Sequence, residues 1–397
     1  MKTVGIICEY NPIHLGHVGH IKKTRKIVGE DSAIICVMSG NYVQRGDFAV
    51  FSKHVRAAAA VRSGADLVVE LPTPYVLLSA EGFARAGVYI LDNMGVCEYI
   101  SFGSESGDLE KLKSAAELVA SHEAEEEIKK WLGEGLSYAA ALQKAADKAA
   151  EGEFSDIFRS PNNVLGIEYL KAINYYNSKL KPLTMTRTGG DHDSDEGYSA
   201  SRLRKILMNG ETPWDLMPEA AAKIYEKEIL EGRGPVFMKD YEAPMLSRLR
   251  MIEDYSQIPN NSEGIDKRFL KYAMSEPTIE EILAKIKTKR YPMSRIRRML
   301  MCACLGIKAE DSALPPSYIK LLAMNEVGAK LLKSAKENSK LPIITKPAEG
   351  KKLFGRAKNL FKTEVSATDF YSLALSSEKE RRGGKEWVTS PVVIDLG

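Results

Sequence analysis

The stretch of sequence that decides the fold is Gly5–His20, which reads GIICEYNPIHLGHVGH. It opens with a short apolar run containing β-branched residues, as is typical of a buried strand. A turn with Asn11 and Pro12 follows, and a helix is predicted from about residue 16 to residue 28. A strand, a polar turn and a helix in this order predict the first unit of a βαβ fold.

The same order repeats along residues 1–209. Further helices are predicted at about 53–63 and 79–94, between short runs that predict strands. The strand runs are Val4–Cys8, Ala33–Met38, Leu67–Leu71, Tyr99–Gly103 and Leu183–Thr188. This alternation predicts an α/β domain with a Rossmann-like parallel sheet and right-handed crossovers. Residues at about 108–180 are rich in Ala, Glu and Lys, and we expect them to form a helical insertion.

Length and charge predict a second domain. The 397 residues are 44% hydrophobic and 27% charged, which is typical of globular proteins and enough for two domains. Residues 1–209 carry 24 Lys and Arg against 27 Asp and Glu, whereas residues 210–397 carry 32 against 26. We expect residues 210–397 to form a mainly helical, basic domain that ends in a short strand near Val392–Ile394. Its charge suggests a polyanionic partner.

Hydropathy and cysteine content suggest the compartment. No stretch approaches the ~20 consecutive apolar residues of a transmembrane helix, and Met1–Gly5 does not begin a signal peptide. The five cysteines are odd in number and three lie in apolar runs, where a reduced thiol behaves as a small hydrophobe. We therefore expect a cytoplasmic protein without disulfides and without membrane contact. The sequence indicates no protein partner.

Polar side chains follow every predicted strand. The polar segments are Asn11–His17, Ser39–Gly46, Pro72–Pro74, Ser104–Ser106 and Gly189–His192. The carboxyl ends of parallel strands lie along one edge of the sheet, and ligands of open α/β sheets bind at that edge. The sequence therefore predicts a substrate crevice there.

Three of the six histidines, His14, His17 and His20, lie at the first strand-to-helix turn. A metal site is one interpretation, but zinc on a helical face requires histidines four residues apart, and these are three apart. Histidines that only satisfy the start of a helix are a second. The favoured interpretation is a triphosphate site. Gly16 lets a phosphate approach the backbone, the helix N-terminus supplies N–H groups, and imidazoles donate to phosphate oxygens.

The pattern His-x-Gly-His, preceded by Asn-Pro, resembles the signature of the nucleotidyltransferase superfamily related to class I aminoacyl-tRNA synthetases. A second motif of that superfamily, of the type Ile-Ser-Ser-x-x-Ile-Arg, is similar to Tyr198–Arg204, which reads YSASRLR. The resemblance implies that His14, His17 and Arg204 are catalytic. It also implies that Ser199 and Ser201 lie at the phosphates, and the departure from Ile-Ser-Ser-Thr leaves open which hydroxyl makes contact.

Longer blocks resemble one bacterial family, the tRNA(Met) cytidine acetate ligases. The blocks are Gly5–His20, Met38–Asn41, Gln44–Gly46, Gly64–Pro72, Phe102–Glu105, Ser160–Gly166 and Lys287–Tyr291. The resemblance implies a ligase that activates acetate with ATP as acetyladenylate. The ligase then acetylates the wobble cytidine of elongator tRNA(Met) to N4-acetylcytidine.

The resemblance also implies the nucleotide contacts, with Mg²⁺ bridging the phosphates. The ATP-binding residues would be Ile7, Cys8, Glu9, Tyr10, Asn11, Pro12, Gly16, His20, Gly103, Asn162, Asn163, Arg187, Ser199 and Ser201. It stays open whether Asn162 or Asn163 contacts the nucleotide.

A basic segment lies in the second half of the chain. It contains no acid, and its seven cations are Lys285, Lys287, Lys289, Arg290, Arg295, Arg297 and Arg298. A solvated helix face normally mixes charges, whereas uncompensated cations beside an aromatic residue such as Tyr291 fit phosphate contacts and base stacking. We predict that this segment binds tRNA, and a merely basic surface is the alternative.

Two other functions remain open. A small-cofactor adenylyltransferase would share both phosphate motifs but would not need a basic second half. A non-catalytic RNA-binding protein on the same scaffold would not need intact His14, Gly16, His17 and Arg204. Labelled acetate, recovered in a nucleoside, in a dinucleotide or in neither, distinguishes the three functions.

Overall fold

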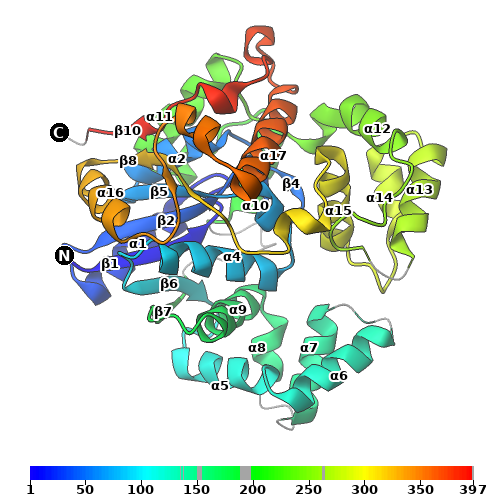
Figure 1. Ribbon diagram of the computed structural model, residues 1–397, viewed down its shortest axis with the longest axis horizontal. Coiled ribbons are helices and arrows are strands. Elements are labelled where there is room, and N and C mark those ends of the chain that lie inside the picture. The colour runs from blue at the N-terminus through cyan, green and yellow to red at the C-terminus, as the bar shows by residue number, and fades with distance from the viewer. Residues whose placement is uncertain (135, 137, 150–153, 188–197, 262–263, 396–397) are drawn as a thin grey trace.

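The computed structural model describes residues 1–134, 136, 138–149, 154–187, 198–261 and 264–395 (Figure 1). In this part of the chain an eight-stranded sheet has the order β10-β8-β5-β2-β1-β6-β7, and β9 (Ile343–Ile344) pairs with β8. The strands in that order are Val392–Val393, Ile319–Met324, Leu67–Leu71, Ala33–Ser39, Thr3–Cys8, Tyr99–Ser104 and Lys181–Thr186. The predicted α/β fold is confirmed.

The five strands predicted from the sequence are neighbours in the sheet and all run parallel. β1 pairs in parallel with β2 and β6, while β2 pairs with β5 and β6 with β7. Helices cover both faces, which explains why strands such as β2 are buried along their whole length. One face is covered by α1 (Leu15–Val28), α2 (Lys53–Arg62), α10 (Ala200–Met208) and α11 (Glu219–Leu230). The other is covered by α4 (Ala80–Asn93), α9 (Pro161–Tyr175) and α16 (Glu326–Asn338).

The last part of the chain returns to this sheet, which the sequence analysis did not anticipate. β8 lies beside β5 and runs antiparallel to it, so the sheet is mixed and not purely parallel. Three short strands after residue 318 therefore join the sheet, while the described residues from 210 onward are otherwise mainly helical, as expected. The β8 sequence, IKLLAM, is composed largely of residues that favour helices, and burial in the sheet overrides that preference. The short terminal strand is confirmed as β10.

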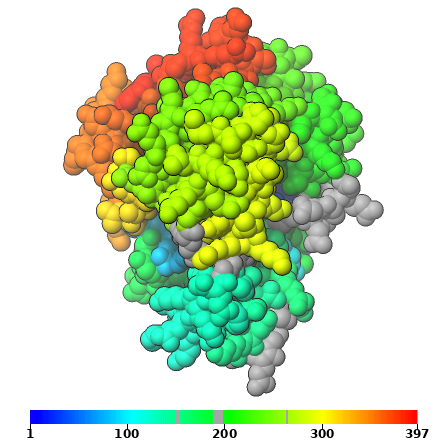
Figure 2. Space-filling view, turned by 90° about the vertical axis from the view of Figure 1, so that its right-hand side faces the viewer, coloured from blue at the N-terminus to red at the C-terminus, as the bar shows by residue number. Residues whose placement is uncertain are grey.

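Two groups of helices flank the sheet (Figure 1), and Figure 2 shows the surfaces that they form, in cyan to green and in yellow-green to yellow. The insertion after β6 contains α5 (Leu109–Val119), α6 (His122–Gly133), α7 (Tyr138–Ala149), α8 (Ser155–Arg159) and α9. A separate block contains α12 (Glu242–Arg250), α13 (Ile265–Ser275), α14 (Ile279–Ile286) and α15 (Met293–Leu305). The block has its own apolar core, in which Cys302 and Cys304 are fully buried as free thiols. No helix in the described ranges is long and apolar enough to span a membrane.

Smaller elements connect these layers. A hairpin of β3 (Tyr42–Val43) and β4 (Asp47–Phe48) follows β2, α3 (Thr73–Val76) follows β5, and α17 (Gly355–Ser372) joins the sheet to the helical block. Short 3-10 turns lie at Trp214–Leu216, Met238–Tyr241, Ala309–Ser312, Pro347–Lys352, Glu378–Glu380 and Lys385–Trp387.

Candidate active site

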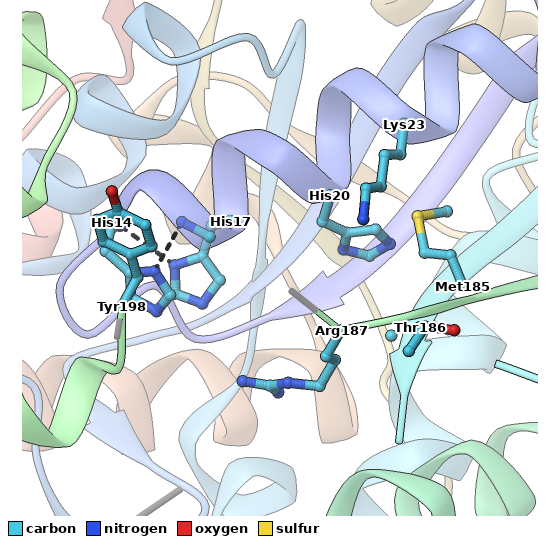
Figure 3. A pocket seen from close by; sticks show the side chains of 10 residues that line it. His14, His17, His20, Lys23, Met185, Thr186, Arg187 and Tyr198 are labelled. Carbon is cyan, nitrogen blue, oxygen red and sulfur yellow. Dashed lines mark hydrogen bonds between the residues drawn. The ribbon is translucent and has the colours of Figure 1, made fainter. Parts of the chain in front are cut away.

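A pocket opens at the carboxyl ends of β1, β6 and β7 (Figure 3). β1 lies between β2 and β6, so the order of the strands along the sheet reverses at β1. Ligands of open α/β sheets bind at such topological switch points. The lining residues are His14, Gly16, His17, His20, Lys23, Gly103, Met185, Thr186, Arg187 and Tyr198. The predicted crevice is thus a pocket on the β6–β7 side of β1.

His14 and His17 form a stacked pair at the start of α1. Their ring centroids are 3.7 Å apart, and Nδ1 of each ring accepts a backbone N–H, from Gly16 at 3.1 Å for His14 and from His14 at 3.3 Å for His17. A neutral imidazole that accepts at Nδ1 carries its proton on Nε2. Both rings are therefore fixed as Nε2–H donors at one end of the pocket.

The start of α1 adds positive potential to this pair. Its first turn contains no acidic side chain, so no carboxylate offsets the positive end of the helix dipole. Gly16 lines the pocket within this turn, and Lys23 lines it two turns further along. One wall of the pocket is suited to an anion.

His20 has a different role from the other two histidines. Its Nε2 lies 2.9 Å from Oγ of Ser101, which is 2.8 Å from Oγ1 of Thr24. Burial, together with the charges of Arg187 and Lys23, lowers the pKa of His20 to about 4. His20 is therefore neutral near pH 7 and fixes the pocket wall by hydrogen bonding.

The opposite wall is built by Arg187 and an asparagine–glutamate cap. A side chain at Gly103 would meet Cγ of Arg187 at 2.9 Å, so the glycine lets the arginine lie across the end of β6. Arg187 Nη1 donates to Oδ1 of Asn162 at 2.8 Å, and Asn162 Nδ2 donates to Glu105 at 2.6 Å. Glu105 also accepts the backbone N–H of Asn163 at 2.9 Å. The cap thus anchors a cation that faces the stacked histidines (Figure 3).

The two asparagines have separate positions. Asn162 contacts Arg187, whereas the buried side chain of Asn163 accepts N–H groups of Glu105 and Ser106 at 2.9 and 3.1 Å. Asn163 therefore builds the loop after β6, and only Asn162 reaches a residue that lines the pocket.

The second motif meets the first at the end of β1. Arg204 Nη1 donates to the carbonyl of Asn11 at 2.8 Å, and its Nη2 donates to Oγ of Ser201 at 3.1 Å. Burial lowers the pKa of Arg204, while Asp47 and Glu9 act in the opposite direction. Ser199 is the N-cap of α10 and accepts the N–H of Arg202 at 3.2 Å. Ser201 is thus the serine that contacts the predicted catalytic arginine.

Several residues predicted to bind ATP do not line the pocket. Ile7 packs against α4, Tyr10 OH lies 3.7 Å from Cys36 Sγ, and Asn11 Oδ1 accepts the N–H of Val50 at 2.8 Å. The pocket lining likewise lacks Cys8, Glu9, Pro12, Asn162, Asn163, Ser199, Ser201 and Arg204. A sequence motif contains residues that form the turn and residues that line the pocket. The sequence pattern alone does not distinguish the two groups.

Four pocket residues were not predicted as site residues from the sequence, namely Lys23, Met185, Thr186 and Tyr198. Lys23 lies three residues after His20 on α1, so helical periodicity from the histidines would have placed it on the same face. Met185 and Thr186 are the last two residues of β7, so they lie at the carboxyl-end edge of the sheet, where the sequence predicts the crevice. The predicted polar segment Gly189–His192 lies outside the described residues.

The basic segment does not form a single exposed surface. Lys285, Lys287 and Lys289 are exposed, and Arg290 is half-buried. Arg295 donates to the carbonyl of Asn260 at 3.1 Å and lies over the ring of Tyr291.

The last two arginines of the segment are engaged with the rest of the fold. Arg297 pairs with Asp47 at 3.2 Å, and Arg298 is only 8% exposed. Burial lowers the pKa of Arg298 to about 10. These positions contradict the expectation that all seven cations are exposed for RNA contact, because α15 turns this end toward the β3–β4 hairpin.

Comparison with known proteins agrees with the geometry of the pocket. A family model described as HIGH Nucleotidyl Transferase matches residues 1–386. A tRNA(Met) cytidine acetate ligase of Acetivibrio thermocellus is 36% identical and covers 99% of this chain and 100% of its own. One of Caldanaerobacter subterraneus subsp. tengcongensis is 37% identical, with 94% and 96% covered. The crystal structure of Thermotoga maritima TmcAL bound with alpha-thio ATP has a TM-score of 0.91 at 30% identity and covers 100% of both chains.

The fold and the histidine pair define a nucleotidyl transferase of the HIGH class. Within that class, the chain belongs to the tRNA(Met) cytidine acetate ligase family. The resemblance noted in the sequence is therefore confirmed.

Proposed function

We propose that the chain is an ATP-dependent ligase that converts acetate to acetyladenylate and then acetylates the wobble cytidine of elongator tRNA(Met), acting in the cytoplasm. The observation that carries this proposal is the stacked pair of His14 and His17 at the acid-free start of α1, facing Arg187 across the pocket. Imidazole N–H donors on one side of the pocket and an arginine on the other are suited to binding a triphosphate. Family membership supports the same choice of substrates.

The first step transfers the adenylyl group to acetate. A carboxylate oxygen of acetate attacks the α-phosphorus, and the bond from that phosphorus to pyrophosphate breaks. Negative charge grows on the phosphate oxygens, and the Nε2–H groups of His14 and His17 are oriented donors for it. Arg204 holds the loop of the first motif through the carbonyl of Asn11 and adds positive charge at the same end of β1.

Mg²⁺ fits this site as an ion that arrives with ATP. Within the described ranges, no group of three or more His, Cys, Asp or Glu side chains is arranged to hold a metal ion. Mg²⁺ commonly binds through substrate phosphates and water, with few protein ligands. Bound in this way, it would neutralise phosphate charge beside the histidines.

The second step requires the tRNA to reach the same pocket. Of the exposed lysines, Lys285 lies in the last turn of α14, and Lys287 and Lys289 follow this helix. The next helix, α15, contacts the hairpin that follows β2. We propose that these lysines hold tRNA phosphates while the cytidine enters beside the end of β1. The cytidine amine attacks the acetyl carbonyl carbon, and AMP leaves.

The test is to incubate the protein with Mg²⁺, ATP, labelled acetate and elongator tRNA(Met), then digest the RNA and analyse the nucleosides. We expect label in N4-acetylcytidine, and acetate-dependent exchange of pyrophosphate into ATP without acetyl-CoA. Label in a dinucleotide would instead indicate a small-cofactor adenylyltransferase. The absence of both exchange and transfer, in a protein that binds tRNA, would indicate a non-catalytic RNA-binding protein.

A further inference from the structure

Acetylation of an amine releases a proton, and the pocket histidines are poorly placed to take it. Nδ1 of His14 and of His17 already accepts a backbone N–H, so Nε2 of each neutral ring carries a proton. Nδ1 of His14 and of His17 is therefore already occupied, and His20 uses Nε2 for Ser101.

Glu9, the first residue after β1, has the geometry of a proton acceptor. Its Oε1 accepts the backbone N–H of Gln44 at 2.6 Å and lies 3.4 Å from Oγ of Ser39. Its backbone carbonyl accepts a hydrogen bond from the fully buried Arg56. Its Oε2 accepts no hydrogen bond from any residue that the structure describes. One carboxylate oxygen is thus fixed in place, and the other remains to accept a proton.

The position of Glu9 separates it from the nucleotide pocket. The pocket lies toward β6 and β7, whereas the two hydrogen-bond partners of the Glu9 side chain come from β2 and from the hairpin after it. The tip of the same hairpin packs on α15, since a side chain at Gly46 would meet the backbone of Arg297 at 2.4 Å. Through this hairpin Glu9 is linked to the helical block that carries the exposed lysines, on the side of β1 opposite β6 and β7.

From this arrangement we propose that Glu9 is the general base of the transfer step. N4 of the cytidine attacks the carbonyl carbon of acetyladenylate, and the new N–C bond forms as the C–O bond to AMP breaks. AMP leaves with that electron pair, and one N4 proton passes to Oε2 of Glu9. The proton is released to water when the product leaves. This inference rests on the proposed function.

The charges around Glu9 set the pH at which it can act. Burial raises the pKa of Glu9, and this outweighs the Gln44 N–H and the nearby cations, which lower it. The cations are Arg204 from α10, Arg56 from α2 and Arg45 from the hairpin. A base acts only when deprotonated, so the transfer rate should fall as the pH drops through this raised pKa.

The experiment measures the two chemical steps separately in the wild type and in Glu9→Gln. Acetate-dependent pyrophosphate exchange, and trapping of acetyladenylate by hydroxylamine as acetohydroxamate, report the first step. Single-turnover acetylation of elongator tRNA(Met) after the intermediate has formed reports the second. Glu98→Gln is the matched control, because Glu98 is exposed and precedes β6 at the opposite edge of the sheet.

We expect Glu9→Gln to form acetohydroxamate at nearly the wild-type rate, and to transfer the acetyl group about 10²–10⁴-fold more slowly. The acidic limb of the transfer rate should disappear in Glu9→Gln and persist in Glu9→Asp. Transfer by Glu9→Gln within about threefold of the wild type, or an unchanged acidic limb, would overturn the proposal. Equal loss of both steps in a folded variant would also overturn it and return Glu9 to nucleotide binding. A wild type without acetate-dependent exchange would overturn the proposed function itself.

Discussion

At the scale of single residues, the hydrogen bonds of two imidazoles determine what the pocket can bind. His14 and His17 use Nδ1 to complete the start of α1, so each supports the helix and presents a donor with the same ring. The two rings are stacked with their centroids 3.7 Å apart, so both donors lie at the same end of the pocket. The pair stabilises growing negative charge through oriented N–H dipoles more than through net charge.

Replacing His17 by Ala tests this role. The variant should lose about 10²–10³-fold in acetate-dependent pyrophosphate exchange, because one donor to the phosphates disappears. The measurement is the exchange rate at saturating ATP, with circular dichroism to show that the fold is retained. His122→Ala is the control, because this histidine on α6 has an 81% exposed side chain. Wild-type exchange by His17→Ala would assign the residue to capping alone.

At the scale of elements, hydrogen bonds connect the N-terminus of α9 to the loop that follows β6. Glu105, just after β6, accepts N–H groups at the start of α9 and orients Asn162, which in turn holds Arg187. A carboxylate at a helix N-terminus also interacts favourably with the helix dipole. The cap therefore links the stability of α9 to the position of the cation in the pocket.

Replacing Glu105 by Gln should weaken both functions of this cap. We expect a loss of about 1–2 kcal/mol in the free energy of unfolding and a several-fold rise in KM for ATP, because Arg187 loses its oriented partner. Chemical denaturation and exchange kinetics measure the two effects. Glu110→Gln is the control, because its side chain is 81% exposed on α5. A change in stability without a change in KM would separate the cap from the nucleotide site.

Element by element, the sequence predicted what local patterns determine. The five parallel strands are short runs rich in β-branched or aromatic residues between turns, and this local pattern predicts them. β8 was not predicted as a strand, because its Leu and Met residues suit a helix equally well and its partner β5 is distant in the chain. The burial of Arg298 was not predicted for a similar reason. A basic run predicts charge, but only the tertiary packing of α15 decides which cations face solvent.

At the scale of the whole molecule, a buried ion cluster ties the end of the chain to the sheet. Lys53 Nζ lies 2.6 Å from Glu70 and 2.8 Å from Glu386, and Lys320 also pairs with both acids. Glu364 on α17 completes the cluster and accepts the hydroxyl of Thr73 at 2.9 Å. Every member is nearly inaccessible to solvent. Three carboxylates share two lysines here, so removing either lysine would leave uncompensated buried negative charge.

The cluster should make stability depend on pH through Glu364. Burial, followed by repulsion from Glu70, raises the pKa of Glu364 to about 7, above its value in the unfolded chain. The folded state therefore holds its proton more tightly, and this contribution to stability is lost as pH rises through about 7. In Glu364→Gln, Tm should rise relative to the wild type, and the gain should be larger at pH 8 than at pH 5.5. A gain independent of pH between these values would contradict the assignment.

The division of work between the sheet domain and the helical block can be tested with charge reversals on opposite sides of the molecule. Replacing Lys285, Lys287 and Lys289 by Glu should abolish tRNA acetylation and leave acetate-dependent pyrophosphate exchange intact. Each lost phosphate contact should lower the slope of log K against log salt by about 0.9. Arg297 and Arg298 are left unchanged, because they pack toward the hairpin and would couple the substitution to the fold.

The matched control carries the same change of charge on α16. Lys330, Lys333 and Lys336 are exposed there, and Figure 1 shows α16 at the opposite end of the molecule from α14 and α15. If net charge alone governed association, both triple variants would weaken tRNA binding equally, and the α14–α15 segment would be an ordinary basic surface. If only the variant of Lys285, Lys287 and Lys289 loses tRNA, the lysines define the RNA contact. If that variant loses pyrophosphate exchange as well while it stays folded, the segment supports the ATP site, and the two steps are not divided between the domains.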